Sequence, residues 1–147
     1  REIAPTVHRL TAAGVPVMGH IGLRPQQCLV EGGYKIAGKT ESAAEALFND
    51  ARAMQEAGAF AIVLECVPAK LAKEISESLD IPTIGIGAGA GCDGQVQVVN
   101  DILGLFTDFI PKHAKRYANL SAEMQRAFTE YVDDVRNRRF PTDANSF

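Results

Sequence analysis

Apolar residues of this sequence recur in two alternating patterns, helical spacing and short continuous runs. Helical spacing predicts helices over residues 1–13, 41–57, 68–79 and 119–138. The continuous runs predict strands over residues 15–21, 59–67, 81–87 and 94–99. In chain order the elements read α-β-α-β-α-β-β-α, which indicates parallel strands joined by right-handed crossovers. Residues 140–147 carry neither pattern and are expected to be irregular.

The clearest predicted helix and strand follow one another directly. In residues 41–57, Leu47 and Ala51 share one apolar face with their neighbours. Residues 59–67 are almost continuously apolar, as expected of a strand that is covered on both faces. The predicted fold class is therefore α/β. Four such strands fit either a small open sheet or half of an eight-stranded barrel, and the pattern alone does not choose between them.

Composition argues against two classes of partner. The net charge is -3, whereas binding to nucleic acid needs clustered Lys and Arg. No apolar run is long enough to span a bilayer, and we expect no signal peptide at the start of the chain. Cys28, Cys66 and Cys92 include no pair at zinc-site spacing, so we expect reduced thiols in a cytoplasmic protein. Because the first residue is Arg1, we expect a processed or trimmed chain, or part of a longer one.

Two residues that could carry chemistry end predicted strands. Glu65 closes an apolar run, and a carboxylate is expensive to bury without a reason. Active sites of parallel β/α folds collect at the carboxyl ends of strands, where a partly desolvated Glu can act as a general base. His20 ends the preceding strand, and a single intervening helix makes the two strands neighbours whose ends face one mouth. The alternatives are a structural Glu, paired with an Arg or capping a helix, and a neutral core histidine.

A glycine-rich turn follows the strand predicted over residues 81–87. Its glycines are Gly85, Gly87, Gly89 and Gly91. Their spacing does not fit the dinucleotide-binding fingerprint G-x-G-x-x-G, which needs a glycine at its sixth position. If the motif starts at Gly85 the sixth residue is Ala90, and if it starts at Gly87 the sixth residue is Cys92. No long helix follows, as the fingerprint also requires. A phosphate or carboxylate could bind exposed amides there, but a tight turn that needs close backbone approach is the favoured interpretation.

Two polar segments offer further groups for binding. Residues 24–40 are longer than most strand-to-helix connections, which is typical of lids and binding loops. Flexibility, an aromatic ring and a positive charge come together there in the run Gly32-Gly33-Tyr34-Lys35. A solvated surface loop is the alternative. A small basic cluster precedes the last predicted helix and is interpreted as a solvated helix entry rather than an anion site: Lys112, His113, Lys115 and Arg116.

Short runs of residues along the whole chain resemble the sequence motifs of one known family, and they occur in the same order. The first group is Gly19-His20-Ile21-Gly22-Leu23, Pro25-Gln26 and Gly32-Gly33-Tyr34-Lys35. The second group is Leu64-Glu65-Cys66-Val67-Pro68, Ile84-Gly85-Ile86-Gly87-Ala88-Gly89 and Cys92-Asp93-Gly94-Gln95. The last group is Phe109-Ile110-Pro111-Lys112, Phe140-Pro141 and Ser146-Phe147. These runs resemble the C-terminal half of ketopantoate hydroxymethyltransferase, an enzyme of pantothenate biosynthesis.

The resemblance implies a fold and a reaction. The fold is a (β/α)8 TIM-type barrel, of which residues 1–147 supply roughly the C-terminal half of a single domain. The reaction transfers a hydroxymethyl group from 5,10-methylenetetrahydrofolate to 3-methyl-2-oxobutanoate and gives 2-dehydropantoate. In this family Mg²⁺ (magnesium) binds the keto acid and favours its enolate. A large homo-oligomer is also implied.

The resemblance also assigns expected roles to individual residues. Glu65 falls on the family's general base, and His20 falls on a residue beside the substrate. Tyr34, Lys35 and Gly87 complete the set of residues expected to bind substrate.

The chain departs from the family pattern in ways that limit these expectations. The first barrel half is missing, and with it the acidic metal ligands and the substrate-binding Ser and Lys. We therefore expect no metal ligands in this chain, although Asp93 and Asp101 are present. Ala37 stands where a Gln is expected, and Ala90 where a larger or turn-forming residue is expected.

Three readings of the function compete. The chain is half of a transferase barrel completed by an N-terminal half, a catalytically silent fragment that folds by association, or part of another barrel lyase that acts on a keto acid. The runs over residues 64–68 and 32–35 count against the lyase.

Overall fold

The computed structural model describes residues 2–27, 29 and 33–147. The chain forms two compact units, Arg1–Val96 and Gln97–Phe147. The first unit holds a parallel sheet with helices packed against it, which confirms the predicted α/β class. Within the described ranges, no helix is both long and apolar enough to cross a bilayer.

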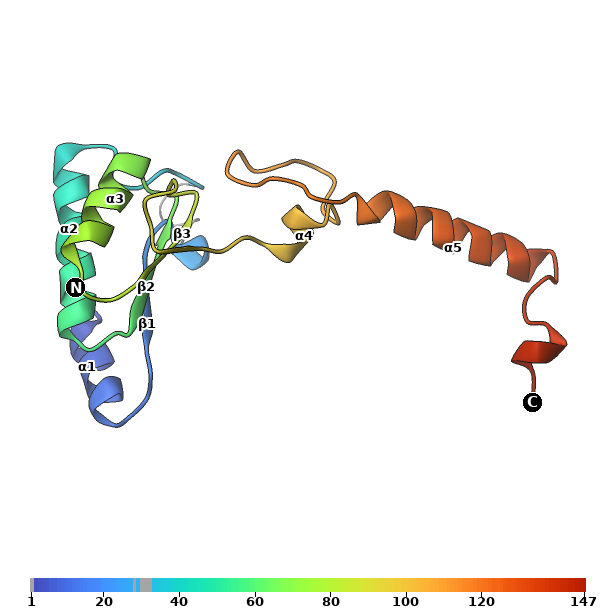
Figure 1. Ribbon diagram of the computed structural model, residues 1–147, viewed down its shortest axis with the longest axis horizontal. Helices are drawn as coiled ribbons and strands as arrows, with labels where there is room; N and C mark the ends of the chain where they lie inside the picture. Colours follow the sequence, from blue (N-terminus) through green and yellow to red (C-terminus); the bar gives the residue numbers. More distant parts are fainter. Residues whose placement is uncertain (1, 28, 30–32) are drawn as a thin grey trace. The chain divides into compact units, whose positions relative to one another are not determined.

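The first unit is built on a four-stranded parallel sheet (Figure 1). In the spatial order β1-β2-β3-β4, its strands are Met18–Gly22, Ala61–Glu65, Thr83–Ile86 and Gly94–Gln95. The register pairs Gly22 with Glu65, and Glu65 with Ile86, so the carboxyl ends of the first three strands meet at one edge. Ligands of parallel β/α folds bind outside this edge.

The α-helices of this unit lie on one face of the sheet (Figure 1). α1, α2 and α3 span Ala4–Ala12, Glu41–Glu56 and Ala69–Ser78. Buried apolar side chains join the helices to the strands, and Ile62 and Leu64 of β2 are completely buried among them. Leu47 and Ala51 of α2 belong to the same core, which confirms the apolar face predicted for that helix.

Side chains alternate along β1 and β2 between the helix-covered face and the opposite face. Ile62 and Leu64 point toward the helices. Val63 lies on the other face of β2, together with Glu65 two residues further on. Because Val63 is the register partner of His20, His20 and Glu65 share the face that lies away from the helices. The fold therefore places both predicted site residues outside the apolar core.

Proline and backbone conformation shorten the predicted strands. Pro16 has no N–H to give to a ladder, and β1 begins later than the predicted residue 15. Pro82 likewise stands directly before β3, which begins later than the predicted residue 81. Cys66 adopts a left-handed φ of 51°, which ends β2 before the predicted residue 67.

The second unit holds one long helix and one short helix. α5 spans Leu120–Arg136, close to the predicted residues 119–138, and α4 spans Val99–Ile102. The strand predicted over residues 94–99 is wrong beyond its first two residues. The N–H of Val96 still donates to the carbonyl of Gly85 at 3.0 Å, but the register of β3 with β4 ends at the pair Gly85 and Gln95. A short 3-10 turn spans Asp143–Asn145 in this unit, and another spans Pro25–Gln27 in the first unit.

Candidate active site

His20 and Glu65 lie together at the carboxyl ends of β1 and β2. The Nε2 atom of His20 is 3.1 Å from Oε2 of Glu65. The two side chains are 37% and 17% exposed, so the carboxylate is the more shielded of the two. The prediction that these strands are neighbours and that both side chains face one mouth is confirmed. A shielded carboxylate beside an imidazole is suited to take up a proton.

The backbone around Glu65 is held by close contacts with β1 and β3. Gly22 has a φ of 94°, and a Cβ at that position would lie 2.2 Å from the carbonyl oxygen of Glu65. The Leu23 N–H donates to the same oxygen at 2.8 Å. On the other side, the Cys66 N–H donates to the carbonyl of Ile86 at 2.9 Å. The end of β2 is therefore fixed on both sides, so the backbone position from which the Glu65 side chain extends is well defined.

The thiol that follows the candidate base is not activated. Partial burial raises the pKa of the Cys66 thiol, and the neighbouring Glu65 carboxylate raises it further. The free thiol is therefore neutral near neutral pH, whereas nucleophilic attack needs the thiolate. Proton transfer by Glu65 is the chemistry that this strand end favours.

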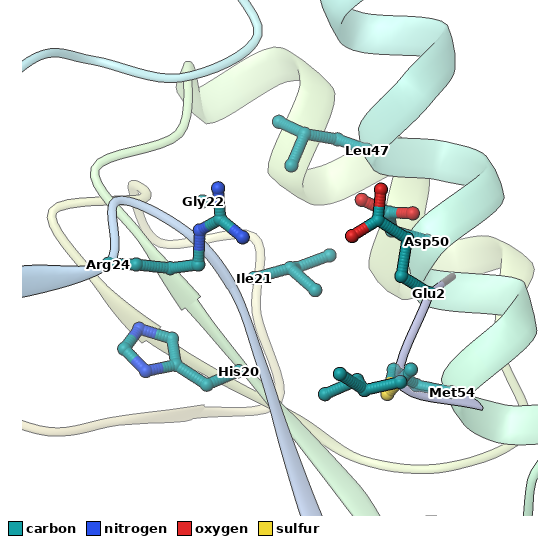
Figure 2. Close-up of a pocket in the computed structure, with 9 residues that line it drawn as sticks. Glu2, His20, Ile21, Gly22, Arg24, Leu47, Asp50 and Met54 are labelled. Atoms are coloured by element: carbon teal, nitrogen blue, oxygen red, sulfur yellow. The ribbon is translucent and has the colours of Figure 1, made fainter. Parts of the chain in front are cut away.

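A cavity of about 790 Å³ opens beside β1 and includes His20 in its wall (Figure 2). Its described lining comes from the start of the chain, β1, the turn that follows and α2: Glu2, Ile3, His20, Ile21, Gly22, Arg24, Leu47, Asp50 and Met54. Figure 2 shows the Arg24 and His20 side chains on one side, with the carboxylates of Glu2 and Asp50 across from them. The wall thus presents charges of both signs.

Sequence reasoning did not single out Arg24 or Asp50 as lining residues. Arg24 stands two residues beyond the end of β1, and a charged residue just past a strand end is a signal that could have found it. Asp50 lies within α2, and its approach to the cavity depends on how that helix packs on the sheet. The sequence around Asp50 does not indicate how the helix packs, so the position of Asp50 at the cavity could not be predicted from it.

The glycine-rich turn after β3 packs closely against α3. A Cβ on Gly89 would lie 2.4 Å from Cβ of Ala69, and a Cβ on Gly91 would lie 2.6 Å from Cβ of Lys73. These distances confirm the interpretation that the turn needs close backbone approach. Gly87, with a φ of 65°, directly follows Ile86 and so stands at the same sheet edge as Glu65. Its expected role in substrate binding remains a prediction.

The long connection between β1 and α2 is tethered at both ends to the end of β2. Its start is held by the hydrogen bond from Leu23 to Glu65, and its far end by the Ala37 N–H, which donates to the carbonyl of Cys66 at 3.0 Å. Between these tethers Tyr34 is 75% exposed. Gly32 lies outside the described residues. Substrate binding by Tyr34 and Lys35 remains a prediction.

The described residues do not fit a magnesium site. Over residues 2–27, 29 and 33–147, no group of three or more His, Cys, Asp or Glu side chains could hold an ion. Asp93 is already engaged, because its Oδ2 accepts from the N–H and the hydroxyl of Thr83 at 2.8 and 2.9 Å. These hydrogen bonds lower the pKa of the Asp93 carboxyl. Asp93 therefore ties the turn to the start of β3.

The basic cluster of the second unit is partly occupied within that unit. The Lys115 ammonium lies 5.0 Å from the centre of the Tyr117 ring, a cation–π geometry. Arg116 donates to the carbonyl of Phe106. Lys112 and His113 are exposed. The exposure of Lys112 and His113 agrees with the interpretation of the cluster as a solvated helix entry.

Comparison with known proteins gives one consistent family. A family model described as ketopantoate hydroxymethyltransferase matches residues 1–143. The chain is 54% identical over 147 residues to a 3-methyl-2-oxobutanoate hydroxymethyltransferase of Syntrophus aciditrophicus, covering 100% of this chain and 54% of the relative. A protein of the same name from Chloroflexus aurantiacus is 59% identical over 140 residues, covering 95% of this chain and 50% of the relative. The chain thus spans about half the length of these relatives.

Proposed function

Because the chain belongs to the ketopantoate hydroxymethyltransferase family, we propose that it forms part of an enzyme with that activity. The enzyme transfers a hydroxymethyl group from 5,10-methylenetetrahydrofolate to 3-methyl-2-oxobutanoate and produces 2-dehydropantoate. The observation that carries the proposal is the placement of Glu65 beside His20 at the carboxyl ends of neighbouring strands.

In the proposed reaction Glu65 acts as the general base. Its carboxylate takes the proton from C3 of the keto acid, and the electron pair left on that carbon forms the new bond to the one-carbon unit. Both bonds from that unit to the folate nitrogens break, water supplies the hydroxyl oxygen, and tetrahydrofolate leaves. Partial shielding at 17% exposure keeps water from competing for the carboxylate, and the fixed end of β2 holds it in one place. His20, Tyr34, Lys35 and Gly87 lie around the substrate in this proposal.

We further propose that residues 1–147 form half of one (β/α)8 barrel. The four parallel strands with helices on one face are the arrangement that a barrel half would have, and the relatives are about twice as long. An N-terminal half would complete the barrel. Since the described residues do not fit a magnesium site, the proposal assigns Mg²⁺ to that other half. A cytoplasmic homo-oligomer is part of the same proposal.

Activity assays of the chain alone and with an N-terminal half test this proposal. We expect negligible formation of 2-dehydropantoate by the chain alone, because stabilising a carbanion next to a ketone needs electrostatic help that the described residues do not supply. Activity should appear when an N-terminal half is added. Strong magnesium-dependent activity of the lone chain would contradict the proposed division of the site. Lack of activity in the mixture, with both halves folded and associated, would favour a catalytically silent fragment.

A further inference from the structure

The contact between His20 and Glu65 assigns a more specific role to the histidine. We propose that His20 is a positioning residue, whose Nε2–H donates to Oε2 of Glu65 and leaves Oε1 to take the substrate proton. This inference rests on the proposed function and refines it. His20 then contributes through the carboxylate rather than through a bond of its own to the keto acid.

The geometry gives this role a physical basis. Nε2 of His20 and Oε2 of Glu65 are 3.1 Å apart, within the range of an N–H donor and an oxygen acceptor. A carboxylate that is 17% exposed has lost much of its water, and a polar partner offsets the cost of its burial. In the proposal, Oε2 is the oxygen that contacts His20, and the other carboxylate oxygen is the one that faces the substrate.

The other groups around the carboxylate are poorer candidates for this role. Cys66 directly follows Glu65 in the chain, and its thiol is a weak donor. On β3 the register partner of Glu65 is Ile86, which carries no polar side chain. Arg24 lies in the cavity that His20 also lines, opposite the carboxylates of Glu2 and Asp50. The structure places the His20 imidazole nitrogen 3.1 Å from the Glu65 carboxylate, within reach for this role.

Positioning has a kinetic signature that differs from substrate contact. The backbone of β2 is held by Gly22, Leu23 and Ile86, but the side-chain torsions of Glu65 are free unless a partner fixes them. Losing that partner lowers the fraction of time that the carboxylate points at the substrate. The turnover number falls, while the affinity for the keto acid is largely kept.

Two variants of His20 distinguish positioning of Glu65 from direct contact with the substrate. Both are measured in the active assembly by exchange of the C3 proton of 3-methyl-2-oxobutanoate. His20→Leu removes the donor, and we expect turnover to fall on the order of tenfold to a hundredfold with little change in KM. His20→Gln keeps an N–H donor on a side chain of similar reach and should recover most of that loss. A rise in KM in both variants with unchanged turnover would overturn the inference in favour of direct substrate contact.

A spectroscopic measurement on the 147-residue chain tests the same contact without activity. The imidazole nitrogens of ¹⁵N-labelled protein report which ring nitrogen carries the proton, and His8 and His113 are internal references. We expect the neutral His20 ring to carry its proton on Nε2, and Glu65→Leu to alter the His20 signals alone. A proton on Nδ1, or His20 signals unchanged in Glu65→Leu, would contradict the inference. A different result would contradict the proposed base instead, namely exchange of the C3 proton of 3-methyl-2-oxobutanoate that survives in the Glu65→Gln variant of the active assembly.

Discussion

Gly22 allows the end of β1 to approach the backbone of the candidate base. Its φ of 94° and the 2.2 Å separation between a built Cβ and the Glu65 carbonyl oxygen leave no room for a side chain. We expect Gly22→Ala to lower the free energy of unfolding by about 2 kcal/mol or more, from backbone strain and from the displaced strand end. Denaturant unfolding measures the change.

Gly14 offers a matched control for this substitution. It also has a positive φ, 83°, but a Cβ there would meet nothing within 4 Å. Gly14→Ala should therefore cost only the conformational strain, roughly 1 kcal/mol. Equal effects of the two substitutions would mean that the contact with the Glu65 carbonyl does not matter for stability.

Asp93 makes stability depend on pH in the acid range. Its folded-state pKa is lowered by hydrogen bonds from the N–H and hydroxyl of Thr83. The folded state therefore binds fewer protons than the unfolded state, and the stabilisation is present above the ordinary carboxyl pKa of about 3.9 and lost as the pH falls through the lowered value. We expect wild type to be more stable than Asp93→Asn at pH 7, with the difference shrinking in acid.

Melting temperatures of both proteins across this pH range check the prediction. Asp108→Asn is the matched control, because Asp108 is exposed and lies in a loop of the second unit. A difference between wild type and Asp93→Asn that stays constant down to the acid limit would mean that the carboxylate charge is not what stabilises the turn.

At the residue scale, the sequence predicted the two groups that end strands but not the groups that depend on packing. Glu65 and His20 could be found because a polar side chain that ends an apolar run stands out. The contact between Asp93 and Thr83 joins residues on either side of the glycine turn, and the sequence did not indicate it. Such contacts follow from the path of the turn, which the apolar pattern does not describe.

The connection between β1 and α2 is the element that we expect to respond to ligand. Both of its ends are hydrogen-bonded to the carbonyls of Glu65 and Cys66, while Tyr34 between them is 75% exposed. An exposed ring contributes little to the core, so Tyr34→Ala should raise the KM for the keto acid or the folate more than it lowers the melting temperature. Unchanged KM values with a lowered melting temperature would make Tyr34 a structural residue.

The alternation of helices and strands could be read from the sequence, but the ends of several elements could not. Pro16 and Cys66 shorten their strands through backbone chemistry that the apolar pattern overlooks. The strand predicted over residues 94–99 was extended by the apolar character of Val98 and Val99. Both are exposed, at 49% and 59%, and Val99 begins α4.

At the scale of the whole molecule, the two units differ in how much apolar surface they bury. The first has a continuous core beneath its sheet. In residues 97–147, all of which the structure describes, Gly104 is the only buried residue. The apolar stripe of α5, which includes Phe128 and Tyr131, is exposed accordingly. Proteins rarely leave such surface uncovered, which agrees with the proposal that further chain or further copies complete the enzyme.

The proposed chemistry rests on Glu65, and proton exchange tests it most directly. The measurement is exchange of the C3 proton of 3-methyl-2-oxobutanoate with solvent, in the active assembly and without the folate, for wild type and Glu65→Gln. The amide keeps the size of the side chain but cannot take the proton, so we expect exchange to fall on the order of a hundredfold or more with the fold unchanged. Exchange at the wild-type rate in Glu65→Gln would contradict the assignment of Glu65 as the base.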